Sequence, residues 1–178
     1  MPITIRAREH RDVAGSPCDR QPTLRVLPVP VLQQTGLGSC GLACTAMAIW
    51  HWTGRQVSQH QLAAELGLEW PVRGGTTMPQ CMDLIGRHSG KKLRQNGAAT
   101  LRTIIAAIDA DGPVLATHRV SETMGHMVLV IGYIRDGPAH PGNAVLVADP
   151  VLRFPVLIPW PAFAASLRDV GIATRDTA

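Results

Sequence analysis

The stretch QTGLGSCGLACTAM, residues 34–47, decides the fold of this chain of 178 residues. A glycine-rich loop ends at Cys40, and apolar residues then recur at helical spacing up to Gly54, which predicts a buried helix that begins at the cysteine. A thiol at this place lies among unpaired N–H groups and at the positive end of the helix dipole, so its thiolate is stabilised. Cys40 is therefore a candidate nucleophile, and the alternative is a buried helix-start cysteine without a chemical role.

A nucleophilic thiol needs a base, and the second half of the chain offers one. His126 opens the β-branched run 126–134, and Asp149 ends the run 144–149 after a turn with Pro and Gly. If the two runs pair as antiparallel strands with His126 against Asp149, imidazole and carboxylate lie on one face, and the acid can orient the ring. This register also pairs Val128 with Val147 and Val130 with Val145.

Three further residues enter the candidate site or compete with it. Gln34 stands six residues before Cys40, and its amide could donate to an oxyanion together with the Cys40 N–H, although it could also be an ordinary polar loop residue. His118, on the run 113–119, is the rival base, and an exposed or packed histidine is the simpler interpretation. Cys44 lies one turn after Cys40, and we interpret it as a packed thiol rather than a ligand. Asp149 itself could be a turn residue before Pro150.

The quoted stretch resembles the Gln, five residues, Cys-Gly-x-Ala signature of papain-clan bacterial peptidases. It is most similar to the bacteriocin leader-peptidase (double-glycine peptidase) family and its free-standing relatives. The resemblance covers roughly Val29 to Phe163. It continues through WTGRQVSQHQLAAELGL (52–68), RGGTTMPQCMDLIG (73–86), GHMVLVIGY (125–133) and VLVADP (145–150).

By this resemblance Gln34 corresponds to the oxyanion-hole glutamine, Cys40 to the nucleophile, His126 to the base and Asp149 to the orienting acid. Papain-like effector proteases of plant pathogens are similar too, but often carry Trp where this chain has Gly41. The implied activity is that of a cysteine peptidase acting on a peptide or protein. An acyltransferase on the same fold, a secreted effector or toxin protease, and a silent peptide-binding domain are the alternatives.

The rest of the chain predicts an α+β, papain-like domain. Ser58, Thr77 and Thr100 can cap three further helices, and β-branched runs between 113 and 160 predict one antiparallel sheet, followed by a short helix from Trp160 to Arg168. Residues 1–23 are polar, Arg-rich and without periodicity, so we expect a mobile N-terminal arm before a peptidase domain over 24–178.

Composition excludes several classes of function. The net charge of +4 comes from Arg residues scattered along the chain, so no basic stripe indicates nucleic acid. No apolar run reaches the ~20 residues of a membrane helix, and we expect a cytoplasmic protein unless a specialised system secretes it. The four cysteines are few and irregularly spaced, and no CxxC or HExxH occurs, so neither a disulfide scaffold nor a metal site is expected. No cofactor is implied.

Overall fold

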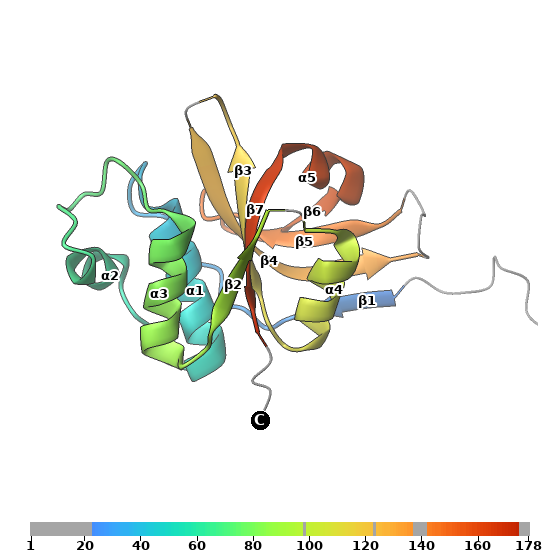
Figure 1. Cartoon of the computed structure of the whole chain (residues 1–178), viewed down its shortest axis with the longest axis horizontal. Helices are drawn as coiled ribbons and strands as arrows, with labels where there is room; N and C mark the ends of the chain where they lie inside the picture. Colours follow the sequence, from blue (N-terminus) through green and yellow to red (C-terminus); the bar gives the residue numbers. More distant parts are fainter. Residues whose placement is uncertain (1–22, 98, 123, 137–141, 175–178) are drawn as a thin grey trace, which may run out of the picture.

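The computed structural model describes residues 23–97, 99–122, 124–136 and 142–174 (Figure 1). The predicted N-terminal arm therefore lies outside the described residues, except Thr23. The helices are α1 (Cys40–Thr53), α2 (Gln59–Glu65), α3 (Met78–Ser89), α4 (Leu101–Asp109) and α5 (Trp160–Ser166). The strands are β1 (Thr23–Val26), β2 (Leu93–Asn96), β3 (Val114–Arg119), β4 (Gly125–Arg135), β5 (Ala144–Ala148), β6 (Val156–Pro159) and β7 (Leu167–Ala173).

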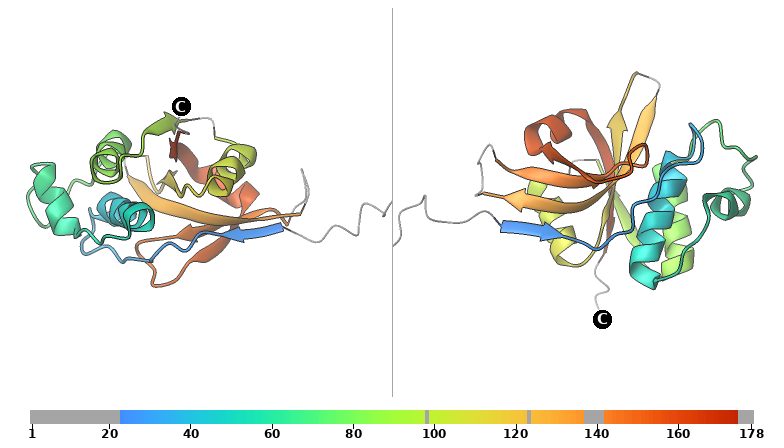
Figure 2. Two further views of the ribbon diagram at one scale, coloured as in Figure 1. Left: turned by 90° about the horizontal axis from the view of Figure 1, so that it is seen from below. Right: turned by 180° about the vertical axis from the view of Figure 1, so that it is seen from behind.

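All seven strands join one antiparallel sheet. Its order is β2-β7-β3-β4-β5-β6, and β1 pairs with the far half of β4. Figures 1 and 2 show α1 and α3 side by side at one side of the sheet, with α4 and α5 at the other end of the molecule. The predicted α+β fold, in which the helix that begins at Cys40 packs on an antiparallel sheet, is confirmed.

The helix boundaries follow from capping residues, as the sequence predicts. Thr77 forms a capping box with Gln80, Ser58 accepts a hydrogen bond from the Gln61 N–H, and Gly54 ends α1 in the left-handed conformation. The middle of α1 is buried on all sides, because it lies between the sheet, α2 and α3. The start of α1 is thereby fixed in space.

The sequence does not predict two of the strands, β2 and β7, and the C-terminal helix is shorter than expected. β2 was not predicted, and α5 ends at Ser166 because the chain enters β7 at Leu167 instead of continuing as helix to Arg168. β7 owes its place to tertiary packing: Val170 is fully buried, and a Cβ at Gly171 would lie 3.0 Å from the Met78 Sδ. Sequence periodicity does not reveal a short strand of this kind.

The predicted register between β4 and β5 is wrong by two residues. Val130 pairs with Val147, not with Val145, and the ladder shifts at a bulge between Val130 and Gly132. One step beyond the last pair, Asp149 stands level with Val128 and therefore two residues from His126 along β4. The shift is an even number, so Asp149 stays on the side of the sheet where the prediction placed it.

Candidate active site

The loop before α1 brings Cys40 to the surface end of a buried helix. Ser39, the residue at the N-cap, makes no side-chain capping hydrogen bond, and Cys40 is half-buried while the next nine residues of the helix are buried. The backbone N–H groups of the first turn therefore remain available to negative charge on the thiol or on a bound substrate.

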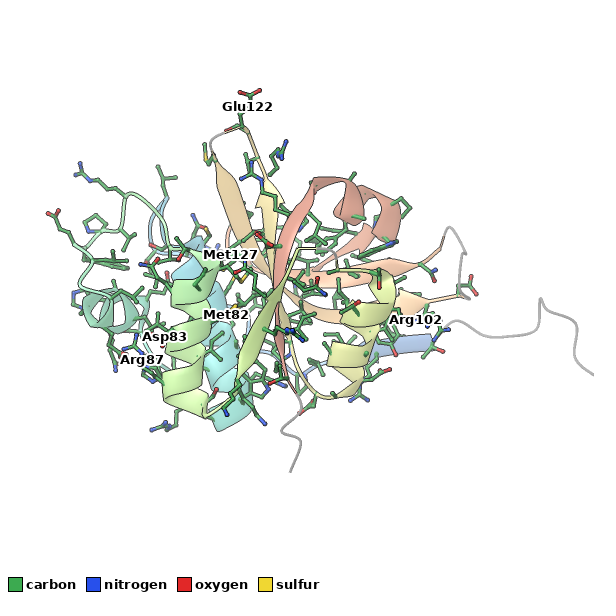
Figure 3. The ribbon with its side chains drawn as sticks, viewed as in Figure 1. Met82, Asp83, Arg87, Arg102, Glu122 and Met127 are labelled. Carbon is green, nitrogen blue, oxygen red and sulfur yellow. The ribbon has the colours of Figure 1, made fainter. Side chains whose placement is uncertain are left out.

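Several groups favour the thiolate form of Cys40. Burial raises the pKa of this thiol, but the hydrogen bond with His126, the N–H groups of Met127 and Gly41 and the charge of the imidazolium outweigh it, so the pKa falls below its ordinary value. Met127, labelled in Figure 3, lies where the sheet meets α1. Its N–H could not be found from sequence, because backbone donors leave no signature in the residue type.

The structure brings His126 and Asp149 together. The His126 Nε2 lies 2.8 Å from the Asp149 Oδ1, and the same oxygen accepts a hydrogen bond of 2.9 Å from the Val151 N–H. Both side chains are only about one-fifth to one-quarter exposed. The Asp149 pKa is lowered: burial raises it, but the hydrogen bond with His126 and the Val151 N–H outweigh that effect.

His126 is charged over a wide pH range in this arrangement. The hydrogen bond with Asp149, followed by that with Cys40, raises its pKa to about 9, against the opposing effect of burial. Since Nε2 is occupied by the carboxylate, Nδ1 is the ring nitrogen left to face the thiol. Thiolate and imidazolium therefore stabilise each other, and this is the reactive form of a cysteine nucleophile.

A hydrogen bond ties the backbone of Gln34 to the loop that follows Asp149. The Gln34 backbone N–H donates to the Pro150 carbonyl at 2.8 Å, so the segment before Cys40 lies against the residue that follows Asp149. The side-chain amide donates one hydrogen bond, of 3.0 Å, to the Gly36 carbonyl. An amide nitrogen carries two protons, and the second is available to another acceptor.

The loop of residues 72–76, which the sequence did not indicate as part of the site, packs directly on the loop that ends at Cys40. A Cβ at Gly38 would lie 2.4 Å from the Val72 carbonyl oxygen, and one at Gly41 would lie 2.1 Å from the Thr76 Oγ1. Residues 72–76 thus form a wall beside Cys40 and require glycine at both positions. A larger side chain at Gly41, such as Trp, would meet Thr76 in the same way.

Gly38→Ala is expected to lower the free energy of unfolding by about 1–3 kcal/mol, because the new methyl group meets backbone that must move. Gly74→Ala is the matched control in the same wall, since a Cβ at Gly74 would meet no described atom within 4 Å. We expect a change within about 0.5 kcal/mol for the control. Urea unfolding followed by circular dichroism measures both, and equal values for the two variants would contradict the close packing of the wall.

The rival residues are engaged elsewhere. His118 pairs with His126 across β3 and β4, but its Nδ1 lies 2.6 Å from the Ser166 Oγ and its ring packs edge-on against Phe163. Burial, then the charge of His126, lowers its pKa. The Cys44 thiol is buried and donates to the Met127 carbonyl at 3.4 Å, and burial raises its pKa well above the ordinary value. The Nδ1 of His118 and the thiol of Cys44 thus already have hydrogen-bond partners, whereas the buried Nε2 of His118 has none among the described residues.

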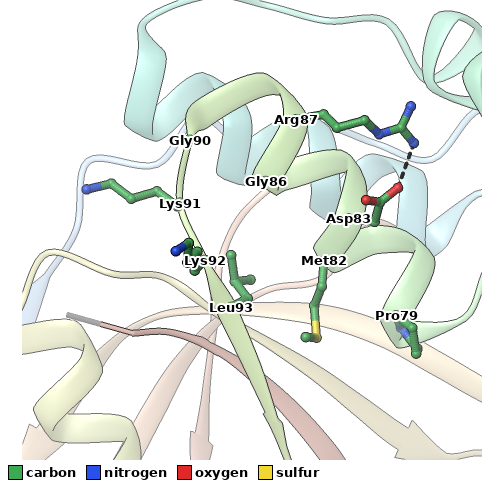
Figure 4. Close-up of a pocket in the computed structure, with 9 residues that line it drawn as sticks. All are labelled: Pro79, Met82, Asp83, Gly86, Arg87, Gly90, Lys91, Lys92 and Leu93. Atoms are coloured by element: carbon green, nitrogen blue, oxygen red, sulfur yellow. Dashed lines mark ion pairs between the residues drawn. The ribbon is translucent and has the colours of Figure 1, made fainter. Parts of the chain in front are cut away.

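Clusters of metal ligands and membrane-spanning helices are absent from the described ranges. No group of three or more His, Cys, Asp or Glu side chains within them could hold a metal ion. None of the described helices is long and apolar enough to cross a membrane. A pocket of about 650 Å³ is lined by α3 and by residues 90–93, which lead into β2, and the 2.9 Å ion pair of Asp83 with Arg87 lies among its lining residues (Figure 4).

Solved structures of peptidases share this fold. A putative C39-like peptidase from Bacillus anthracis superposes with a TM-score of 0.61 at 18% identity, covering 86% of this chain and 98% of that one. The peptidase domain of Streptococcus ComA, a bifunctional ABC transporter of a quorum-sensing pathway, gives 0.60 at 16% identity and covers 83% and 99%. A double glycine motif protease from an AMS/PCAT transporter, in complex with the leader peptide, gives 0.58 at 18% identity and covers 83% and 92%.

Sequence comparison agrees with the fold. No curated protein matches the chain significantly. The model of one family, described as the Peptidase_C39 like family, matches residues 26–155 and thus most of the chain. The resemblance inferred from the sequence is confirmed at this level. The chain belongs to the Peptidase_C39 like family and is a cysteine peptidase.

Proposed function

We propose that this peptidase cleaves peptide bonds with a triad of Cys40, His126 and Asp149. The observation that carries the proposal is the 2.8 Å contact of the His126 Nε2 with the Asp149 Oδ1. That contact leaves the His126 Nδ1 free to face the Cys40 thiol. Burial raises the pKa of this thiol, but His126 lowers it by more. Nucleophile, base and orienting acid are thus linked in the order that covalent catalysis requires.

The reaction begins with attack of the Cys40 thiolate on the carbonyl carbon of the scissile bond. The His126 imidazolium then gives its proton to the leaving amine, the C–N bond breaks, and a thioester joins the acyl part to Cys40. In the second half the neutral imidazole takes a proton from water, the resulting hydroxide attacks the thioester, and the thiolate leaves with the acid product. Asp149 holds the ring and stabilises its charged form throughout.

The oxyanion of both steps is held, in this proposal, by the second amide proton of Gln34 and by the Cys40 backbone N–H. The hydrogen bond to Gly36 fixes the amide before the substrate arrives, so little reorganisation is needed in the transition state. The anchoring of the Gln34 backbone on Pro150 supports this role, because it links the donor to the acid loop.

The substrate is proposed to be a peptide or protein. The similar double glycine motif protease was solved in complex with the leader peptide, which supports a peptide as the class of ligand. Because the reaction is hydrolysis of a peptide bond, its products are a free carboxylate and a free amine.

Cys40 is expected to react with iodoacetamide faster than Cys18, Cys44 or Cys81 near neutral pH. Its pKa is lowered, whereas burial raises the pKa of Cys44 and Cys81 and hides both thiols. The alkylation rate of Cys40 should stay high at pH values at which an ordinary thiol is protonated. The reason is that His126, with a pKa of about 9, is still charged at these pH values and stabilises the thiolate. Mass spectrometry after brief labelling measures this, and equal labelling of all four sites, or preference for Cys44, would overturn the choice of nucleophile.

A further inference from the structure

The side chain of Gln59 makes three hydrogen bonds to the loop that carries Gln34. Gln59 is the first residue of α2, which packs on α1, and only 9% of its surface is exposed. Its Nε2 donates to the Gln33 carbonyl at 2.7 Å, and its Oε1 accepts from the Thr35 N–H and from the Thr35 Oγ1, both at 3.1 Å. A buried amide thus ties the start of α2 to a segment 24 to 26 residues earlier in the chain.

The partners of this amide fix which of its ends is the nitrogen. The nitrogen of an amide donates hydrogen bonds, and its oxygen accepts them. In the reverse orientation the Gln59 oxygen would face the Gln33 carbonyl, and the Gln59 nitrogen would face the Thr35 N–H. Two acceptors would then meet at one end and two donors at the other, so the amide bonds to the loop in one direction only.

The backbone groups that Gln59 holds belong to the peptide units on either side of Gln34. The Gln33 carbonyl is part of the unit that precedes the Gln34 Cα, and the Thr35 N–H is part of the unit that follows it. The first unit also contains the Gln34 N–H, which donates to the Pro150 carbonyl at 2.8 Å, so this unit is held at both ends. Because peptide units are planar, holding both of them fixes the direction of the Gln34 Cα–Cβ bond.

The side chain of Gln34 has little else to direct it. Its Nε2 donates to the Gly36 carbonyl, two residues further on in the same loop, at 3.0 Å. Its Oε1 is buried and has no hydrogen-bond partner among the described residues. The direction of the amide therefore depends on the main chain of the loop, and this main chain is held by Gln59 and Pro150.

We propose that Gln59 is a positioning residue for the peptidase reaction, which holds Gln34 so that the second proton of its amide faces the oxyanion. The inference rests on the oxyanion role proposed for Gln34. Gln59 acts through the main chain of Gln33 and Thr35, and not by contact with the substrate. A displacement of about 1 Å in a catalytic group can lower the rate by about 10²-fold, so the effect of losing Gln59 is expected in kcat.

Steady-state kinetics on a peptide selected by library cleavage tests the inference. Gln59→Met keeps the length of the side chain and removes all three hydrogen bonds. We expect it to lower kcat by about tenfold to hundredfold, with KM changed less than about threefold. Labelling of Cys40 by iodoacetamide should proceed at the unchanged rate, because no oxyanion forms in that reaction.

Gln61→Met is the matched control on the same helix. The Gln61 side chain is exposed, and its amide donates to the Glu65 Oε1, also in α2, at 3.4 Å. We expect kcat and KM of this variant to stay within about twofold of those of the unchanged chain. If Gln59→Met behaved like Gln61→Met, the inference would be overturned.

A double-variant cycle with Gln34→Ala shows whether Gln59 acts through Gln34. If it does, Gln59→Met should lower kcat by less than about twofold once residue 34 is already alanine. An equal fall of about tenfold or more in both backgrounds would overturn the inference alone, because Gln59 would then act on another group or on the fold. A kcat that Gln34→Ala leaves unchanged would overturn the proposed oxyanion role and the inference with it.

Thr35→Val is the second variant, and it decides the question if circular dichroism shows that Gln59→Met does not fold. It removes one hydroxyl from an exposed residue and keeps the hydrogen bond of the Thr35 N–H to Gln59. The loss of one hydrogen bond should lower kcat by about threefold, with no further loss in the Gln34→Ala background. An unchanged kcat in Thr35→Val, or the same fall in both backgrounds, would then overturn the inference.

Discussion

His126→Ala should remove nearly all peptidase turnover, whereas Asp149→Asn should lower it by at least about tenfold and leave measurable activity. Without the imidazole, nothing protonates the leaving amine or activates the water. An asparagine can still hold the ring through its amide, but it does not stabilise the imidazolium as the carboxylate does at 2.8 Å. kcat/KM on a cleaved library peptide measures both variants.

Two controls make this comparison decisive. Circular dichroism must show that both variants fold like the unchanged chain. His118→Gln tests the rival base: its ring is engaged with Ser166 and Phe163, so the change should affect activity little once folding is shown to be intact. Full activity in Asp149→Asn together with loss in His118→Gln would contradict the triad and place the base on β3.

The sequence predicts the ends of helices well, because one residue and its near neighbours determine them. Gly54 ends α1 with a φ of 68°, and Thr77 begins α3 with both hydrogen bonds of a capping box, because these preferences lie in a few neighbouring residues. β7 and the register of β4 on β5 are different. The strand depends on burial against Met78 and Met82 of α3, and the register depends on a bulge near Ile131, so neither can be read from alternation alone.

The candidate site divides in the same way. Cys40 and His126 are suggested by residue type and position at element ends, and the predicted closeness of His126 to Asp149 agrees with the structure although the register that suggested it is wrong. The even shift explains this, because it keeps both side chains on one side of the sheet. The Met127 N–H and the wall of residues 72–76 depend on tertiary packing and have no comparable signal in the sequence.

Gln34→Ala should lower kcat by about 10² to 10³ while alkylation of Cys40 remains largely unchanged. The reason is that an oxyanion donor acts only when negative charge develops on the substrate carbonyl, which alkylation of the thiol does not involve. The hydrogen bond from the Gln34 backbone to Pro150 survives the substitution, so the loop should keep its place. Steady-state kinetics and iodoacetamide labelling of the same preparation measure the two effects.

Gln33→Ala is the matched control, because the chain offers the same residue type one position earlier. The Gln33 side chain is exposed, and its amide reaches only the Val151 carbonyl, at 3.5 Å, whereas the Gln34 amide is partly buried and bonded within the nucleophile loop. The two residues are adjacent in the chain and their amides bond to different carbonyls, so the two amides cannot both face the oxyanion. We therefore expect Gln33→Ala to change kcat by less than about tenfold. If Gln33→Ala proved the damaging change and Gln34→Ala the mild one, the donor would be Gln33, and the spacing of six residues before Cys40 would not define the oxyanion hole.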